Sequence, residues 1–208
     1  SALVAYTLGT GDNKKANEIF SLLIYTLVAT GIVFTIIGII FIKPISHLLG
    51  ADEEMLPYCV KYGRTILIAL VPFMLMNIFQ SFLVTAELPH YGLIITIASG
   101  VVNVILDALF VAVFKFGVIG AAVATGISQA IGGFIPLFIF IFSKKSKLHL
   151  GRTHFSKKAL LKSCANGSSE FMSNVAVSLV NMLYNWQLMK LLGHNGVTSY
   201  GVIMYVNY

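Results

Sequence analysis

The chain has 208 residues, of which 57% are apolar and only 11% are charged, and its formal net charge is +6. Soluble domains carry about 25% charged residues, so this composition and the mean hydropathy of +0.87 argue against a soluble protein and predict an integral membrane protein. The positive charge does not indicate a nucleic-acid partner, because the basic residues gather between apolar stretches instead of forming one polar face.

Five apolar stretches follow one another along the chain. A helix needs about 20 apolar residues to cross a bilayer core of about 30 Å, and four stretches reach that length while the fifth does so narrowly. The chain is also expected to be a piece of a longer protein, since it opens on what reads as the last turns of an apolar helix. We therefore predict an all-α integral membrane protein whose spans cover 19–42, 65–85, 91–114, 117–142 and 171–189.

The Lys and Arg residues predict which ends of the spans share a side of the membrane. Residues 12–15 and 144–162 carry nine of them, whereas the opposite ends carry five. Cytoplasmic loops are enriched in Lys and Arg, so we expect these two stretches and 86–90 in the cytoplasm and 43–56 outside. A short amphipathic segment at 155–165 is expected to lie on the membrane surface as a linker helix.

Cysteine and histidine residues predict neither redox nor metal chemistry. Cys59 and Cys164 fall on opposite sides of the membrane in this topology, too far apart for the Cα separation of up to about 7 Å that a disulfide allows. The five His residues are scattered through loops and chain breaks without ligand spacing, so no metal site is expected.

The third span carries a polar stripe. Its polar and small residues recur at steps of three and four, which places them on one helix face, and Asn103 and Asp107 are neighbours on that face. A carboxylate near the centre of a span costs about 2.5 kcal/mol or more, and such acids usually face a cavity, a partner or an ion path. Asp107 is therefore the leading candidate for an ion-coupling residue. The alternative is a structural acid paired with a neighbouring helix.

The second and fourth spans also carry polar residues on one face. In the second span Asn77 lies past the middle, and Pro72 interrupts the helix and can act as a hinge. In the fourth span Thr125 and Gln129 share a face with small residues. These residues either line a cavity or only allow the helices to pack closely.

The fifth span places Glu170, Asn174 and Asn181 in one stripe. Amides at this density are costly unless they face water or each other, which favours a cavity. Glu170, however, falls in the first helical turn, where an acid complements the helix dipole. That structural explanation of Glu170 stands beside the functional one.

Motifs of catalysis are absent from the sequence. It contains no His-Glu-x-x-His pair, and residues 9–12 lack the Lys and Ser or Thr that complete a phosphate-binding loop. We therefore expect no enzyme activity and no cofactor, and the energy for any transport must come from an ion gradient or a partner.

Three segments resemble the MATE (multidrug and toxic compound extrusion) family. Residues 8–16, LGTGDNKKA, are similar to the LGxGDxxxA loop that follows the second helix of that family. Residues 103–110, NVILDALF, and 117–129, GVIGAAVATGISQ, look like its fifth and sixth helices. The resemblance covers essentially the whole chain, which then runs from the end of helix 2 to the start of helix 8 of a prokaryotic-type transporter.

The resemblance implies a multi-helix transporter bundle with twelve helices in two six-helix lobes and alternating access between them. Residues 1–143 then form most of the N-terminal lobe, without its first helix. Residues 144–166 form a cytoplasmic linker with the short amphipathic helix, and 167–208 begin the C-terminal lobe.

The family also implies an ion-coupling cluster in the first lobe. In prokaryotic members this cluster includes an acid on helix 1, an Asn and an Asp on helix 5, an Asn on helix 4 and a Thr on helix 6. The matching residues here are Asp107, Asn103, Asn77 and Thr125, and the helix-1 acid has no counterpart in this chain. Ala108 stands where many relatives have Pro, which leaves the local bend of the helix open.

The implied function is a secondary active multidrug exporter of the bacterial plasma membrane, which exchanges amphipathic, often cationic compounds for H⁺ or Na⁺. Its partners are drug-like small molecules and the lipid bilayer, while the substrate, coupling ion and oligomeric state stay open. One alternative is a lipid-linked oligosaccharide flippase of the same superfamily, which basic residues inside the central cavity would favour. Another is a receptor or structural membrane protein without transport. The candidates for the substrate cavity are Gln129, Asn174, Asn181 and Glu170.

Overall fold

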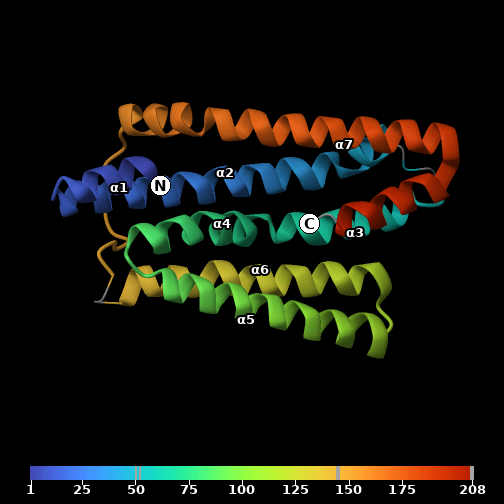
Figure 1. Ribbon diagram of the computed structural model, residues 1–208, viewed down its shortest axis with the longest axis horizontal. Coiled ribbons are helices and arrows are strands. Elements are labelled where there is room, and N and C mark those ends of the chain that lie inside the picture. The colour runs from blue at the N-terminus through green and yellow to red at the C-terminus, as the bar shows by residue number, and fades with distance from the viewer. Residues whose placement is uncertain (50, 52, 144–145, 207–208) are drawn as a thin grey trace.

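The computed structural model describes residues 1–49, 51, 53–143 and 146–206, and every regular element within them is a helix. This confirms the predicted all-α class. Figure 1 shows the helices as rods that run roughly along one common axis. The elements in chain order are α1 (Ala2–Gly9), α2 (Asn13–Leu48), α3 (Leu56–Ile68), α4 (Leu70–Thr85), α5 (Pro89–Asp107), the π-helix η1 (Ala108–Val113), α6 (Gly117–Phe142) and α7 (Lys157–Val206).

The loop between α1 and α2 is a tight turn that its glycine and aspartate favour. Gly11 has φ +86°, a left-handed conformation that glycine adopts without steric penalty. Asp12 is the N-cap of α2, and its carboxylate accepts a hydrogen bond from the Lys15 backbone N–H at 3.1 Å. This cap satisfies one of the free N–H groups at the start of the helix.

Among the described residues, three helices are long and apolar enough to cross a membrane, namely α2, α5 together with η1, and α6. A fourth span is possible if α3 and α4 are taken together, although they are bent by 47°. The break falls at Ala69, just before Pro72. A proline lacks an N–H donor and its ring clashes with the carbonyl four residues earlier, which here belongs to Ile68, so the chain bends at the end of α3.

The predicted fifth span, 171–189, lies within α7 but is not among the helices that pass as membrane spans. Its amides, including Asn174 and Asn181, lower its hydropathy. α7 is also two helices joined at Gly193, whose φ +62° and ψ −154° are not helical. The Tyr200 hydroxyl donates to Asn181 Oδ1 at 3.0 Å, so the part after Gly193 folds back along the part before it.

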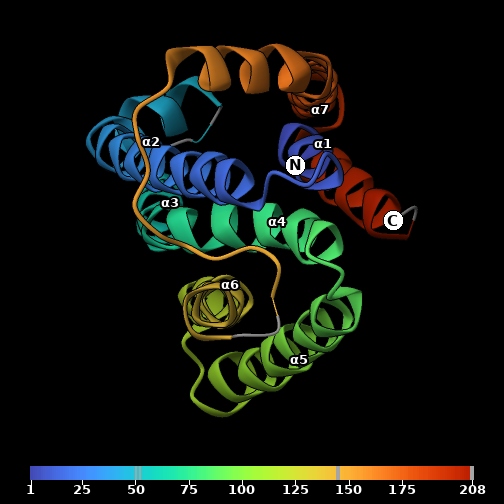
Figure 2. The same ribbon diagram turned by 90° about the vertical axis from the view of Figure 1, so that its left-hand side faces the viewer.

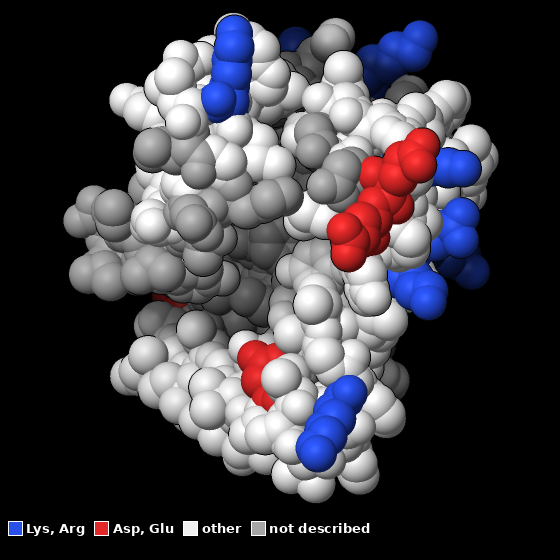
Figure 3. Space-filling view, turned by 90° about the vertical axis from the view of Figure 1, so that its right-hand side faces the viewer, with Lys and Arg blue, Asp and Glu red and all other residues white. Residues whose placement is uncertain are grey.

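The loops predicted to share one side of the membrane do meet at one end of the bundle. Lys147 pairs with Glu87, and Thr153 Oγ1 donates to the Glu18 carbonyl oxygen at 2.7 Å. Figure 3 looks onto the opposite end, where acidic side chains gather beside basic ones at one edge of a mostly uncharged surface. Which of the two ends faces the cytoplasm stays a prediction.

An aromatic core holds α2, α4 and α6 together near the first of these ends. Phe20 packs against Phe82 with ring centroids 4.8 Å apart and against Phe140 at 5.0 Å, and Phe79 lies 5.3 Å from Phe140. All four rings are fully buried. Each aromatic side chain removes about 150–250 Å² from water or lipid contact, so this cluster is the main packing unit that positions α4 and α6.

The segment between α6 and α7 crosses the same end of the bundle. Figure 2 shows it running from the end of α6 past α4 and α2 to the start of α7. The first turns of α7 then lie across the bundle axis before the helix turns along it. A helix thus occupies the predicted 155–165 linker region from Lys157 onward, and its place on the membrane surface stays a prediction.

Candidate functional site

Asn103 and Asp107 lie one turn apart near the end of α5, and both are half-buried. Within them, Asn103 Nδ2 and Asp107 Oδ1 are buried and have no hydrogen-bond partner among the described residues. Among the described residues, Ser163 Oγ is the only other buried side-chain atom without a hydrogen-bond partner. Because most buried polar atoms in proteins are paired, these two atoms on one helix face are a candidate place for a ligand.

The chemistry of the pair fits a proton or a small hard cation. A buried polar atom left without a partner costs about 1–3 kcal/mol, which a bound ion or water recovers. Turning the Asn103 amide by 180° exchanges its donor for an acceptor at the same place. Asn103 and Asp107 then offer one amide and one carboxylate oxygen, the ligands that hard cations prefer.

Asn77 and Thr125, the other predicted coupling residues, stand on helices beside this pair. α4 and α5 both pack along α6, so all four residues belong to one three-helix group. Asn77 is exposed and its Nδ2 donates to the Phe73 carbonyl oxygen at 2.8 Å. Thr125 is half-buried, and its carbonyl oxygen accepts from Ser128 Oγ at 2.8 Å. These bonds lie within their own helices, and no hydrogen bond among the described residues joins Asn77 or Thr125 to Asn103 or Asp107.

A hydrogen bond between α4 and α5 extends the polar face of α5. Gln80 Nε2 donates to Thr96 Oγ1 at 3.1 Å, and the same hydroxyl donates to the Gly92 carbonyl oxygen at 2.9 Å. Sequence reasoning does not pair Gln80 with Thr96, although each is a polar residue in an apolar span. The bond fixes the polar face of α5 relative to α4 two turns before Asn103.

α5 changes its helical form directly after Asp107. The N–H of Phe114 donates to the Leu109 carbonyl oxygen, five residues earlier, at 2.9 Å, as in a π-helix. The bend that the sequence leaves open at Ala108 is therefore a π-helical turn. Such turns within α-helices occur frequently at functional sites, and this one places Asp107 at the junction of two helical forms.

The predicted cavity residues of the second lobe form local networks on α7. Asn174 Nδ2 donates to the Glu170 carbonyl oxygen at 2.8 Å and lies 3.4 Å from Glu170 Oε1. Asn181 instead binds Tyr200, as described above, and Tyr184 stacks on that tyrosine at 5.7 Å. Glu170 and Asn174 are thus brought together. Gln129 lies half-buried on α6, outside both networks.

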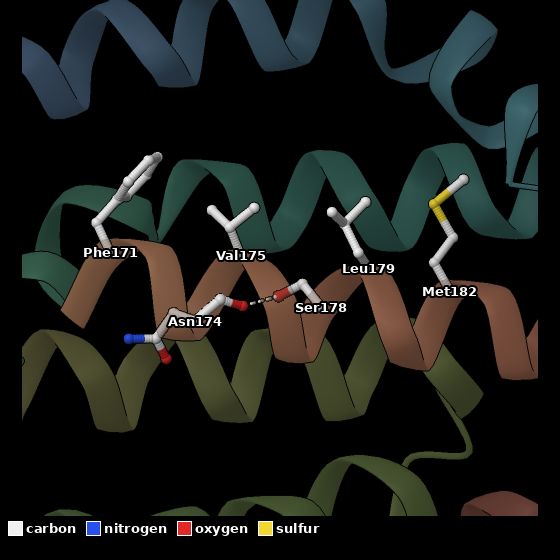
Figure 4. A pocket seen from close by; sticks show the side chains of 6 residues that line it. All are labelled: Phe171, Asn174, Val175, Ser178, Leu179 and Met182. Carbon is white, nitrogen blue, oxygen red and sulfur yellow. Dashed lines mark hydrogen bonds between the residues drawn. The ribbon is translucent and has the colours of Figure 1, made fainter. Parts of the chain in front are cut away.

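A pocket of about 300 Å³ runs along α7. Figure 4 shows its side chains projecting from successive turns of the helix, with Ser178 Oγ donating to the Asn174 carbonyl oxygen at 2.8 Å. Asn174 is the one predicted cavity residue that lines it. The surface is mainly apolar with a small polar part, as expected for a site that takes amphipathic molecules. The lining residues are Phe171, Asn174, Val175, Ser178, Leu179 and Met182.

A second cavity, of about 520 Å³, lies between α1 and the first turns of α7. It contains the exposed basic side chain of Lys162, beside Asn166. The remaining lining residues are Ala2, Leu3, Tyr6 and Ala165.

Comparison with known proteins places these features in a family. The MatE family model matches residues 1–109. Multidrug export protein MepA of Staphylococcus saprophyticus is 27% identical over 202 residues, which cover 96% of this chain and 44% of that protein. MepA of Staphylococcus aureus strain MRSA252 is 25% identical with the same coverage. The chain thus spans less than half the length of the curated relatives it matches.

Solved structures share the fold at low identity. An inward-facing multidrug resistance MATE transporter of the MOP superfamily aligns with a TM-score of 0.87 and 20% identity, over 95% of this chain and 45% of that one. A MOP superfamily transporter from Pyrococcus furiosus, described as having a binding pocket of reverse polarity, aligns with a TM-score of 0.85 and 19% identity. That alignment covers 98% of this chain and 46% of the other.

Proposed function

Because the chain belongs to the MATE family of membrane transporters, we propose that the transporter containing it is a secondary active multidrug exporter. It moves amphipathic, often cationic organic compounds out of the cell in exchange for H⁺ or Na⁺. The name of the MepA relatives, multidrug export protein, supports the substrate class. The described residues contribute most of one lobe and the first helices of the second, so the activity belongs to the full-length protein.

The observation that supports ion coupling is the buried, unpartnered pair Asn103 Nδ2 and Asp107 Oδ1. Ion binding there neutralises or pairs the carboxylate, which removes the cost of holding a charge in a low-dielectric span. The pair lies on α5 two turns after the Gln80–Thr96 bond that joins this helix to α4, so in this mechanism ion binding acts on the packing of α5 against its neighbours. In this mechanism the two occupancy states favour different openings of the transporter.

Dye efflux from vesicles that contain the full-length protein tests the proposal. Export is driven by an imposed pH gradient or an imposed Na⁺ gradient, and the gradient that supports efflux identifies the ion. We expect Asp107→Asn to reduce efflux to the level of vesicles without the protein, while insertion stays normal, because removing a charge from a span does not oppose insertion. Asn77→Ala and Thr125→Ala are expected to weaken efflux less.

Glu54→Gln is the matched control, since it makes the same carboxylate-to-amide change at an exposed position between α2 and α3. It should export at the normal rate. Normal export by Asp107→Asn would show that the coupling site is wrong, whereas the absence of gradient-driven efflux in the unmodified protein would overturn the function itself.

Lys162 favours testing a second function, a lipid-linked oligosaccharide flippase. A basic side chain lines the cavity between α1 and α7, and a cation there suits an anionic diphosphate group better than a cationic drug. Transfer of a fluorescent lipid-linked oligosaccharide between leaflets, measured in the same vesicles, distinguishes the two activities. A flippase moves this lipid and leaves the dye, and Lys162→Gln then slows the movement.

A further inference from the structure

We propose that one face of α2 is a docking site for residues 147–153, which we call the strap, and that this docking makes the strap part of the first lobe. Movement of α7 relative to that lobe is then taken up only at 154–156. The docking stands independently of transport, whereas its role in lobe movement rests on the proposed function.

Three polar side chains of α2 bind the backbone of the strap. Asn17, Ser21 and Tyr25 follow one another at steps of four, so they share a helix face. Asn17 Oδ1 accepts from the His149 N–H at 2.9 Å, and Ser21 Oγ accepts from the Gly151 N–H at 3.0 Å. The Tyr25 hydroxyl donates to the Gly151 carbonyl oxygen at 3.2 Å.

The spacing of the two segments explains why these bonds form together. Four residues of α-helix advance about 6 Å, and two residues of extended chain advance about 6.6 Å. Side chains four apart on α2 therefore meet alternate backbone N–H groups of the strap. Ser21 is fully buried, and a buried hydroxyl requires a partner, which the strap provides.

Leu148 and Leu150, each next to a residue that binds α2, pack into the aromatic core. Leu148 is fully buried and belongs to the cluster that contains Phe20 and Phe140. Leu150 packs against the same cluster, and its N–H donates to the Phe140 carbonyl oxygen at 3.0 Å. From 148 to 151 the strap thus alternates: the backbone of His149 and Gly151 binds α2, whereas Leu148 and Leu150 pack inward, as in an extended segment.

The strap is held at both ends as well. Lys147 pairs with Glu87 at the end of α4, and Thr153 Oγ1 donates to the Glu18 carbonyl oxygen of α2 at 2.7 Å. Beyond Thr153 the side chains of His154 and Phe155 are exposed, and α7 begins at Lys157. The hydrogen-bonded part of the strap therefore ends at Thr153, and the next contact with the core of the first lobe is that of Ala159 in α7.

Docking changes how far the start of α7 can move. A fully extended chain spans at most about 3.3–3.6 Å per residue, so the three residues 154–156 allow about 10 Å. A strap released from residue 147 onward would allow about 35 Å by the same measure. The docked strap is thus a short tether between the lobes, and a released strap is a long one.

Amide hydrogen exchange and trypsin digestion of the full-length protein in detergent test the docking. In the unmodified protein we expect slow exchange at the amides of His149 and Gly151 and slow cleavage after the exposed Arg152. Asn17→Ala combined with Ser21→Ala should accelerate both by tenfold or more, since the acceptors are lost. Thr26→Val is the control, because Thr26 Oγ1 donates only to the Leu22 carbonyl oxygen of its own helix at 2.8 Å. Unchanged protection in the double variant overturns the docking.

A covalent lock tests the role in movement and does not depend on how the double variant folds. Asn17→Cys with His149→Cys, in a background carrying Cys59→Ser and Cys164→Ser, joins the strap to α2 by a disulfide. We expect dye export to continue with the bond formed, because a docked strap does not leave α2 during the cycle. Export that stops on oxidation and returns on reduction would overturn this. If the unmodified protein exports nothing, the proposed function fails, while exchange and digestion still decide the docking.

Discussion

The Asn103–Asp107 pair restricts which kind of ligand can bind there. An unpartnered carboxylate oxygen and an unpartnered amide nitrogen lie one turn apart on α5, and an ion bound by both requires the amide to turn. A water molecule satisfies them too, but it does not balance the charge of Asp107. Charge balance inside a span is therefore the property that selects a cation or a proton.

We expect Asn103→Ala in the full-length protein to raise the half-saturating concentration of the coupling ion roughly tenfold, because one of the two groups that face the ion is lost. The measurement is export rate against ion concentration. Ser99→Ala, one turn earlier, is the control, since Ser99 Oγ donates to the Thr96 carbonyl oxygen at 3.0 Å and should leave the value unchanged. An unchanged value for Asn103→Ala would contradict an ion site at this pair.

Alanine substitutions at two adjacent glycines of α6 are expected to destabilise the protein to different extents. A Cβ added at Gly133 would lie 2.6 Å from the Pro72 carbonyl oxygen of α4, whereas one at Gly132 would lie 2.6 Å from Met76 Sδ. The Pro72 carbonyl cannot move without the rest of α4, whereas the flexible Met76 side chain can rotate away. We expect Gly133→Ala to lower the free energy of unfolding by about 1–3 kcal/mol and Gly132→Ala by less, measured by thermal unfolding in detergent. Equal losses would contradict this packing of α4 on α6.

At the scale of helices, the sequence predicts the extent of the apolar spans better than the positions where helices break. The predicted span 117–142 coincides with α6, whereas the predicted 19–42 covers only the apolar part of α2, which extends into polar residues at both ends. Pro72 signals a break that the structure places at Ala69. The π-helix after Asp107 has no clear sequence signal, because its residues are ordinary apolar ones.

Orientation in the membrane is testable from the two ends of the bundle. In a background of Cys59→Ser and Cys164→Ser, we expect an impermeant thiol reagent to label Glu54→Cys in intact cells and His154→Cys only after permeabilisation, as the Lys and Arg distribution predicts. Both positions are exposed. The reverse pattern would invert the orientation and leave the helix arrangement intact.

At the scale of the whole chain, the division at 1–143, 144–166 and 167–208 stays a prediction that the strap refines in one respect. Leu148 and Leu150 pack with the core of the first segment, although the sequence places them among Lys residues in a loop. Nothing local marks Asn17 and Ser21 as the partners of His149 and Gly151, since the bonds join residues about 130 positions apart. The candidate Asp107 could be predicted because an acid in an apolar span is a local signal, whereas the strap depends on long-range contacts.

Packing is uneven along the bundle axis. Among the described residues, the large fully buried side chains, such as Phe20, Phe79, Phe82 and Phe140, lie in the half nearer the strap, whereas α3 and η1 bury none. A helix held at one end is displaced most at its other end when it tilts. A tilt of about 10° at the clamped end displaces the far end of a span about 30 Å long by about 5 Å. Any rotation at the aromatic cluster would therefore displace the opposite end of the bundle several times further than the clustered end.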